Sequence, residues 1–289
     1  MKRVLQAVVT ILLTVCLPAA LLAAPADWPK KLTVGLIPTE SSSHITDRFD
    51  SLHKYLEKKL GIPVELKTST DYAGVITAMQ FKHVDLAYFG PKSYVEAAQR
   101  ANAECFAIEV DESGNRGYYS LLIAKKGSQI TSIQAAKGKV FAFTDPNSTS
   151  GMLVPTIYFM KELKIEPEKY FSRVIYSGSH EASMLAVKAG KVDIAAISDL
   201  DMNRGEGKFW EQEKDFAVLW KSKLIPGSNM AYRKDLPESL KKALKEAFLT
   251  YNDKEGLKQL KLKEYAAVTD SLYDPIRDQI EVKKQLGKK

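Results

Sequence analysis

Three consecutive hydroxyl residues and a glycine follow an apolar, strand-like run in the segment Asp145-Pro146-Asn147-Ser148-Thr149-Ser150-Gly151. The preceding residues Val140–Phe143 are apolar, and a helix-like apolar run follows the glycine. The N-terminus of a helix leaves backbone N–H groups without intrahelical partners and carries the positive end of the helix dipole, so it can bind an anion without lysine or arginine. Ser148, Thr149 and Ser150 would add hydroxyl donors. The segment therefore predicts an anion-binding loop.

The same segment has a simpler interpretation, because Ser148 or Asn147 could merely cap the helix. Pro155 raises a second question, since a proline beyond the first turn displaces the carbonyl four residues before it. Either the helix kinks at Pro155, or the loop is a turn and the helix begins at Pro155. The Asn147-Ser148-Thr149 sequon could accept a glycan. We rank that hypothesis below a role in a ligand cleft.

The N-terminus has the pattern of a secretory signal. Lys2 and Arg3 precede an apolar run over residues 4–17, and small residues lead to Ala24-Pro25-Ala26. This order of charged, apolar and A-x-A segments predicts export, with residues 1–26 removed by cleavage after Ala26. The run is short for a membrane span, and no later segment approaches one. The sequence therefore predicts a periplasmic protein.

The two cysteines limit the covalent chemistry of the chain. Cys16 lies in the signal segment, and Val15 before it is larger than the residue that lipoprotein signals require, so we rank a soluble exported protein above one that is lipid-anchored at Cys16. Removal of the signal leaves Cys105 alone. An intramolecular disulfide and a thiolate metal site are then excluded, and the fold must depend on its hydrophobic core.

Composition and charge favour a globular protein that binds small anions. The 289 residues are 45% hydrophobic, enough for one large core or two smaller ones. The formal net charge of +7 is spread through mixed segments such as 54–59 and 241–246. Mixed charges of this kind indicate solvated helix faces rather than a nucleic-acid stripe, and a positive field also attracts small anions. No nucleic-acid partner is expected.

Strand-like and helix-like segments alternate along the chain, which predicts an α/β fold. The expected elements are strands at 32–37, 64–66, 84–88 and 118–124, and helices around 49–60, 73–81 and 240–251. Residues 76–87 align without gaps to residues 184–195, and each segment has a helix feeding a strand through a Val-Asp pair. This internal repeat predicts two related α/β lobes.

Two α/β lobes joined by crossing strands leave a cleft between them, and ligands of open sheets bind beyond the carboxyl ends of the strands. The loop at Ser148 falls on that edge of the second lobe. We expect a discontinuous first lobe, residues 27–117 and 227–289, and a second lobe, residues 118–226. Closure about the crossings would follow the pattern of a hinged binding protein.

Six segments resemble the phosphonate-binding (PhnD-like) proteins that serve ABC importers. They are Thr70–Val75, Val84–Gly90, Gly117–Ser120, Asp145–Pro155, Ser177–Glu181 and Leu224–Gly227. The resemblance extends over nearly the whole chain after the signal. It implies a type II periplasmic binding protein fold whose cleft holds a phosphorus oxyanion, and a permease in the inner membrane as partner.

The resemblance also implies roles for single residues. The run Ser148, Thr149 and Ser150 would bind the oxyanion through hydroxyls and amides. Tyr118 and His180 match residues that touch it, and Tyr72 matches an aromatic residue that closes over the ligand. At low pH a charged His180 imidazole would be the stronger donor. Without the resemblance, the tyrosines could be core aromatics and the histidine a helix cap.

One position departs from the receptors for aminoalkylphosphonates. Those receptors carry an acid after the Ile225-Pro226-Gly227 segment to pair the ligand ammonium, whereas this chain has Ser228. Asp199 and Asp201 lie near a second family acid, and the sequence leaves open which of them faces the cleft. A buried, unpaired ammonium is costly. The sequence therefore favours phosphite, methylphosphonate or phosphate as ligand and does not choose among them.

Two other functions remain open from the residues. Asp199-Leu200-Asp201 could hold Mg²⁺ beside a phosphate in a metal-dependent enzyme acting on a phosphate ester. The same fold could act as the sensing partner of a membrane kinase. The four histidines show no metal-ligand spacing, and no nucleophile elbow or Walker loop occurs. We therefore expect a binding protein that is not an enzyme and has no metal or cofactor.

Overall fold

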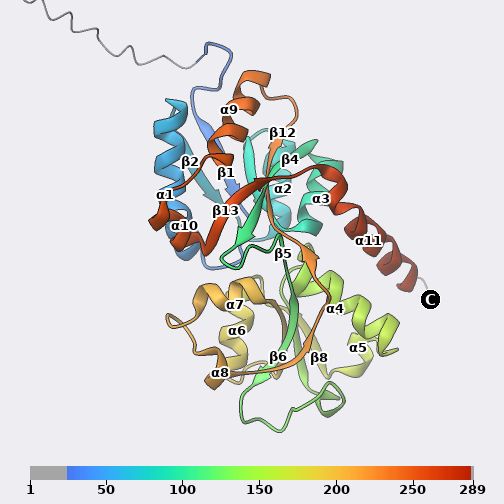
Figure 1. The fold of residues 1–289 in the computed structure, drawn as a ribbon. Helices are drawn as coiled ribbons and strands as arrows, with labels where there is room; N and C mark the ends of the chain where they lie inside the picture. The colour runs from blue at the N-terminus through green and yellow to red at the C-terminus, as the bar shows by residue number, and fades with distance from the viewer. Residues whose placement is uncertain (1–24, 288–289) are drawn as a thin grey trace, which may run out of the picture.

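A computed structural model describes residues 25–287 (Figure 1). It contains two α/β lobes: lobe 1 is built on a six-stranded sheet and lobe 2 on a five-stranded sheet. Cys16 and the proposed signal segment, apart from Pro25 and Ala26, lie outside the described residues, so cleavage after Ala26 stays a prediction. Within residues 25–287, no helix is long and apolar enough to cross a membrane.

The sheet of lobe 1 takes strands from both ends of the chain. Its order is β13 (Leu262–Ala267), β4 (Ala103–Asp111), β12 (Asn229–Arg233), β3 (Leu86–Phe89), β1 (Leu32–Leu36) and β2 (Val64–Thr68). The strands β1, β2 and β3 are parallel, and β12 is antiparallel to both of its neighbours. The helices of this lobe are α1 (Ser42–Leu60), α2 (Tyr72–Gln80), α3 (Pro91–Arg100), α9 (Glu238–Leu249), α10 (Lys254–Leu260), η4 (Asp270–Tyr273) and α11 (Asp274–Leu286).

The sheet of lobe 2 has the order β10 (Phe216–Lys221), β6 (Ser120–Lys125), β9 (Ile194–Ser198), β7 (Val140–Phe143) and β8 (Arg173–Tyr176). Its helical segments are η1 (Gln134–Ala136), η2 (Thr149–Leu153), α4 (Val154–Ile157), η3 (Tyr158–Glu162), α5 (Pro167–Tyr170), α6 (His180–Lys188), α7 (Asp199–Gly205) and α8 (Gln212–Asp215). The parallel strands β7 and β9 lead into η2 and α7, so the N-termini of these two segments lie at the same edge of the sheet.

Two crossings connect the lobes side by side. The short strands β5 (Gly117–Tyr118) and β11 (Ile225–Pro226) pair antiparallel to each other. The strand expected from Tyr118 to Ala124 is therefore two strands, β5 and β6. The break falls at Tyr119, whose N–H donates to the Asp199 carboxylate at 2.8 Å. The boundaries 117/118 and 226/227 of the lobes stay a prediction.

The internal repeat has a structural counterpart in both lobes. In lobe 1 the Asp85 carboxylate accepts a hydrogen bond from the Thr33 N–H at 2.9 Å, at the start of β1. In lobe 2 the Asp193 carboxylate accepts one from the Val140 N–H at 2.8 Å, at the start of β7. Each aspartate thus joins its own strand to the neighbouring parallel strand. The Val-Asp pair occurs twice because its aspartate forms the same hydrogen bond between parallel strands in both sheets.

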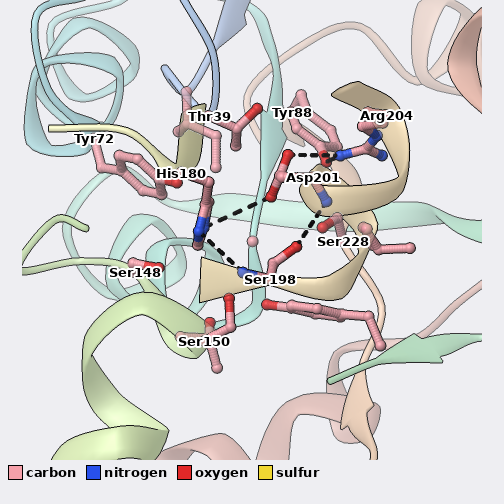
Figure 2. Close-up of a pocket in the computed structure, with 15 residues that line it drawn as sticks. Thr39, Tyr72, Tyr88, Ser148, Ser150, His180, Ser198, Asp201, Arg204 and Ser228 are labelled. Atoms are coloured by element: carbon pink, nitrogen blue, oxygen red, sulfur yellow. Dashed lines mark hydrogen bonds and ion pairs between the residues drawn. The ribbon is translucent and has the colours of Figure 1, made fainter. Parts of the chain in front are cut away.

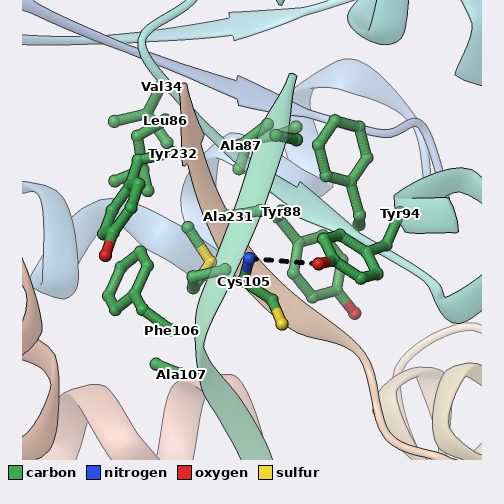
Figure 3. Packing of buried hydrophobic residues seen from close by; sticks show 14 of the residues in the cluster. Val34, Leu86, Ala87, Tyr88, Tyr94, Cys105, Phe106, Ala107, Ala231 and Tyr232 are labelled. Carbon is green, nitrogen blue, oxygen red and sulfur yellow. Dashed lines mark hydrogen bonds between the residues drawn. The ribbon is translucent and has the colours of Figure 1, made fainter. Parts of the chain in front are cut away.

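The core of lobe 1 joins residues far apart in the sequence. Figure 3 shows side chains of β3, β4 and β12 packed together, among them Phe106 and Tyr232, which stack with ring centroids 4.7 Å apart. Cys105 is a free, buried thiol within this cluster, and its N–H donates to the Tyr94 hydroxyl. The amphipathic helix α9 adds Leu240, Leu244 and Phe248. The C-terminal part of the chain thereby completes lobe 1.

Candidate ligand-binding site

A small cavity lies between the lobes (Figure 2). Its volume is about 20 Å³. A cavity needs about 10–15 Å³ to hold one ordered water molecule. Lobe 1 contributes Thr39, Tyr72, Tyr88 and Ser228, the crossing β5 contributes Tyr118, and lobe 2 contributes Ser148, Thr149, Ser150, His180, Ser198, Asp201 and Arg204. These side chains are all buried. The cavity therefore suits a compact, polar ligand.

The hydroxyl run both caps a helix and lines the cavity. Ser148 is the cap of η2, and its Oγ accepts the Gly151 N–H at 2.9 Å. Thr149 Oγ1 accepts the Lys92 N–H at 2.8 Å, which leaves its own proton free to donate. In the part of the chain that the structure describes, the N–H groups of Thr149 and Ser150 donate to no protein acceptor. The cap thus orients a helix end whose free donors line the cavity.

Pro155 is the second residue of α4, so the α-helix begins one residue before it. The first turn, η2, is a π-helix, and α4 follows it directly from Val154. Proline supplies no N–H to the carbonyls one turn before it. The Gly151 carbonyl accepts the Thr144 N–H at 3.0 Å instead, and the Ser150 carbonyl accepts the Ser120 hydroxyl at 2.6 Å. These two outside donors replace the missing hydrogen bonds and hold the loop on the sheet.

Gly151 is required by this close approach. A Cβ atom at this position would lie 2.2 Å from Thr144 Oγ1 and 2.3 Å from Thr144 Cβ. Real Cβ contacts of that length do not occur, so any side chain would push the loop away from β7. The glycine at the end of the hydroxyl run therefore fixes where the N–H groups point.

Tyr72 and Tyr118 line the cavity from two different elements. Tyr72 is the first residue of α2, and its N–H donates to the Asp145 carboxylate of lobe 2 at 3.3 Å. Tyr118 ends β5. Burial raises the pKa of both phenols well above the usual value for tyrosine. Both hydroxyls therefore keep their protons and can donate to an anion.

His180 lies at the start of α6 and faces Asp201. Its Nδ1 accepts the Ser198 N–H at 3.1 Å, so the proton of the neutral ring is assigned to Nε2, which lies 3.7 Å from Asp201 Oδ2. Burial lowers the pKa of His180. From the sequence we expected a charged imidazole at low pH. Because a backbone donor occupies Nδ1, the structure instead favours a neutral ring with one N–H donor toward the cavity.

The two aspartates of the D-x-D segment face different surroundings. Asp201 lines the cavity, and its Oδ1 accepts from Arg204 Nη1 at 3.2 Å. Asp199 does not line it, because its carboxylate accepts the Tyr119 N–H on the other side of α7. Within residues 25–287, no three histidine, cysteine or acidic side chains are grouped to hold a metal ion. Of the two candidates, Asp201 is the one placed to meet a ligand.

Sequence reasoning missed Arg204. Its Nη2 donates to both oxygens of Glu109 at 3.1 and 3.3 Å, and its Nη1 lies 3.4 Å from the Tyr88 hydroxyl. Glu109 and Tyr88 belong to lobe 1, so Arg204 of lobe 2 forms a buried ion pair with Glu109 of lobe 1. The spacing of Asp201 and Arg204, three residues apart on one helix, was the available signal.

Helix N-termini of each lobe bond to the other lobe around the cavity. In addition to the Tyr72 and Lys92 bonds, the His180 N–H donates to the Thr39 carbonyl at 3.1 Å. Lys92 Nζ also donates to the Asn147 side chain at 2.8 Å. The loop that carries the hydroxyls is thus held from the opposite side. The two lobes are in direct contact around the cavity, an arrangement that we call closed.

The chain is similar to known proteins along most of its length. Residues 34–273 match the family described as ABC transporter, phosphonate, periplasmic substrate-binding protein. The phosphonates-binding periplasmic protein of Escherichia coli is 36% identical over 271 residues, which cover 91% of this chain and 80% of that protein. The phosphate-import protein PhnD of Mycolicibacterium smegmatis is 34% identical over 232 residues, 76% of this chain and 72% of that protein. The structure of PhnD1 from Prochlorococcus marinus in complex with methylphosphonate superposes with a TM-score of 0.78 at 25% identity, covering 87% of this chain and 97% of that one.

Proposed function

This chain belongs to the family of periplasmic substrate-binding proteins of phosphonate ABC transporters, and on that premise we propose that it captures a compact phosphorus oxyanion and delivers it to a membrane permease. The fold is the type II periplasmic binding protein fold. The chain is a binding protein rather than an enzyme, and the periplasmic location named for the family and for the Escherichia coli relative implies export. The role as sensing partner of a kinase stays a hypothesis.

The observation that carries the proposal is the free N-terminus of η2. Two backbone N–H groups, those of Thr149 and Ser150, are available there together with three hydroxyls. Backbone amides at a helix N-terminus suit phosphate-like anions, and donors fixed in advance need little reorganisation on binding. His180 Nε2 adds a donor from α6. Together, these N–H and O–H donors suit the negatively charged oxygens of a tetrahedral oxyanion.

The opposite end of the cavity supports a ligand without an amine. Ser228 stands where the resemblance places an acid in receptors for aminoalkylphosphonates, and it lines the cavity. The remaining acid, Asp201, is already paired with Arg204. An ammonium group there would find no carboxylate whose charge is free. The small volume also favours phosphite, methylphosphonate or phosphate over a longer ligand.

Calorimetric titration of the mature protein tests this preference. We expect at least one of phosphite, methylphosphonate and phosphate to bind about 10-fold or more tightly than 2-aminoethylphosphonate, a difference of about 1.4 kcal/mol. The variant Ser228→Asp should narrow that gap, because it adds a negative charge that can pair with the ammonium. If 2-aminoethylphosphonate is the tightest ligand of the parent protein, the proposed preference is wrong and Asp201 must act as its counter-charge.

A further inference from the structure

Asp201 has one oxygen that the protein leaves unused. The side chain is 5% exposed and projects from the first turn of α7 between His180 and Arg204 (Figure 2). Its Oδ1 accepts from Arg204, whereas its Oδ2 has no hydrogen-bond donor among the described residues. The nearest polar group is His180 Nε2 at 3.7 Å, beyond hydrogen-bond distance. A buried carboxylate oxygen is therefore available beside the cavity.

The carboxylate is ionised at neutral pH. Burial by itself would raise the pKa of Asp201, but His180, Arg204 and the Ser198 hydroxyl outweigh burial and hold the pKa below its usual range. The charged and titratable groups that face Asp201 are His180, Arg204, Arg48, Asp199 and the phenols Tyr72, Tyr88 and Tyr118. An ionised carboxylate accepts hydrogen bonds and donates none. Oδ2 can consequently accept a hydrogen bond from a ligand.

The cavity thus combines several hydrogen-bond donors with one open acceptor, Asp201 Oδ2. The N–H groups of η2 and His180 Nε2 suit oxygens that carry negative charge. Oδ2 of Asp201 suits an oxygen that carries a proton. A fully deprotonated anion would place one of its oxygens against this carboxylate, and two charged acceptors in a buried site repel each other.

We propose that Asp201 selects the protonation state of the ligand: its Oδ2 accepts a hydrogen bond from a P–OH group, so that the cavity binds phosphorus oxyanions that retain a proton and rejects those that do not. This inference rests on the proposed function and deepens it. Arg204 compensates the charge of Asp201, so the open oxygen serves a neutral O–H donor better than an ammonium. Asp201 is a specificity residue in this account and takes part in no reaction.

Three ligands that differ in the proton they can donate test this proposal in the unmodified protein. Hydrogen phosphate keeps one proton well above neutral pH, methylphosphonate loses its last proton near neutrality, and sulfate has none to donate. Between about pH 8 and pH 9 we expect the affinity for methylphosphonate to fall about 10-fold, because each pH unit above a pKa lowers the protonated fraction about 10-fold. The affinity for phosphate should stay constant over the same interval, which controls for titration of the protein. Sulfate should bind about 100-fold or more weakly than phosphate.

The variant Asp201→Asn tests the residue itself. Asparagine has nearly the same shape, and its amide can donate to a deprotonated oxygen. We expect the pH dependence for methylphosphonate to disappear and the preference for phosphate over sulfate to shrink about 10-fold or more. Asp199→Asn is the matched control: it changes the same functional group on the same helix, outside the cavity, and should retain the pH dependence and the sulfate discrimination of the parent.

The outcomes distinguish this inference from the proposed function. If phosphate, phosphite and methylphosphonate all fail to bind, the proposed function is wrong. If they bind but sulfate binds as tightly as phosphate, or methylphosphonate keeps its affinity from about pH 8 to pH 9, only the role of Asp201 is wrong. The pH profile of the parent protein decides this even if Asp201→Asn does not fold.

Discussion

Replacing Thr149 or Ser150 by alanine is expected to weaken binding of the best phosphorus oxyanion roughly 10- to 150-fold for each substitution. Hydrogen bonds to charged groups contribute roughly 1.5–3 kcal/mol each, which corresponds to that range of dissociation constants. Both residues are at most 2% exposed and line the cavity at the free end of η2. Titration calorimetry of each variant against phosphate and methylphosphonate gives the dissociation constants.

Ser132→Ala is the matched control for a serine whose hydroxyl only accepts a backbone N–H beside a helical turn. Its Oγ accepts the Ala135 N–H at 3.2 Å in lobe 2, at a half-buried position outside the cavity lining. Loss of such a hydrogen bond costs about 1 kcal/mol of stability and should leave the affinity unchanged. If Thr149→Ala and Ser150→Ala behave like Ser132→Ala, with a lower melting temperature and parental affinity, the hydroxyl run is only structural.

The variant Arg204→Ala should cause the largest loss of stability. It would leave the carboxylates of Asp201 and Glu109 buried without their closest cation, and breaking a buried ion pair in this way costs about 3–5 kcal/mol. Arg48 Nη1 is 4.0 Å from Glu109, beyond hydrogen-bond distance, and replaces only part of the lost interaction. Urea unfolding monitored by circular dichroism measures the change.

Arg100→Ala provides the comparison for that experiment. Arg100 pairs with Glu96 at 3.5 Å on the surface of α3, and its side chain is 41% exposed. A surface pair of this kind contributes about 0.5 kcal/mol or less. A loss of stability in Arg204→Ala no larger than that in Arg100→Ala would mean that the buried network between the lobes does not stabilise the closed arrangement.

Much of the site could be predicted from local sequence. The hydroxyl run follows an apolar strand, and this order alone indicated a helix N-terminus with free donors. The repeated Val-Asp pair indicated two related lobes. The structure explains the repeat, because Asp85 and Asp193 each accept a backbone N–H from the neighbouring parallel strand. Both inferences depend on interactions within a few residues or on a pattern that occurs twice.

The features that sequence reasoning missed depend on contacts between distant segments. The π-helical turn before Pro155 persists because Thr144 and Ser120 supply the missing donors. The choice between Asp199 and Asp201 follows from where α7 begins, since the two residues are about half a helical turn apart and their side chains point to opposite sides. The pair of Arg204 with Glu109 spans 95 residues and forms only when the two lobes meet. A single sequence contains no local signal for that contact.

The most direct test of the central claim is a crystal structure of the protein with bound phosphate. We expect the phosphorus atom in the cavity between the lobes, with its oxygens within hydrogen-bond distance of the Thr149 and Ser150 N–H groups and of His180 Nε2, and with one oxygen against Asp201 Oδ2. Phosphate bound elsewhere on the molecule, or bound in the cavity without contact to Thr149 and Ser150, would contradict it.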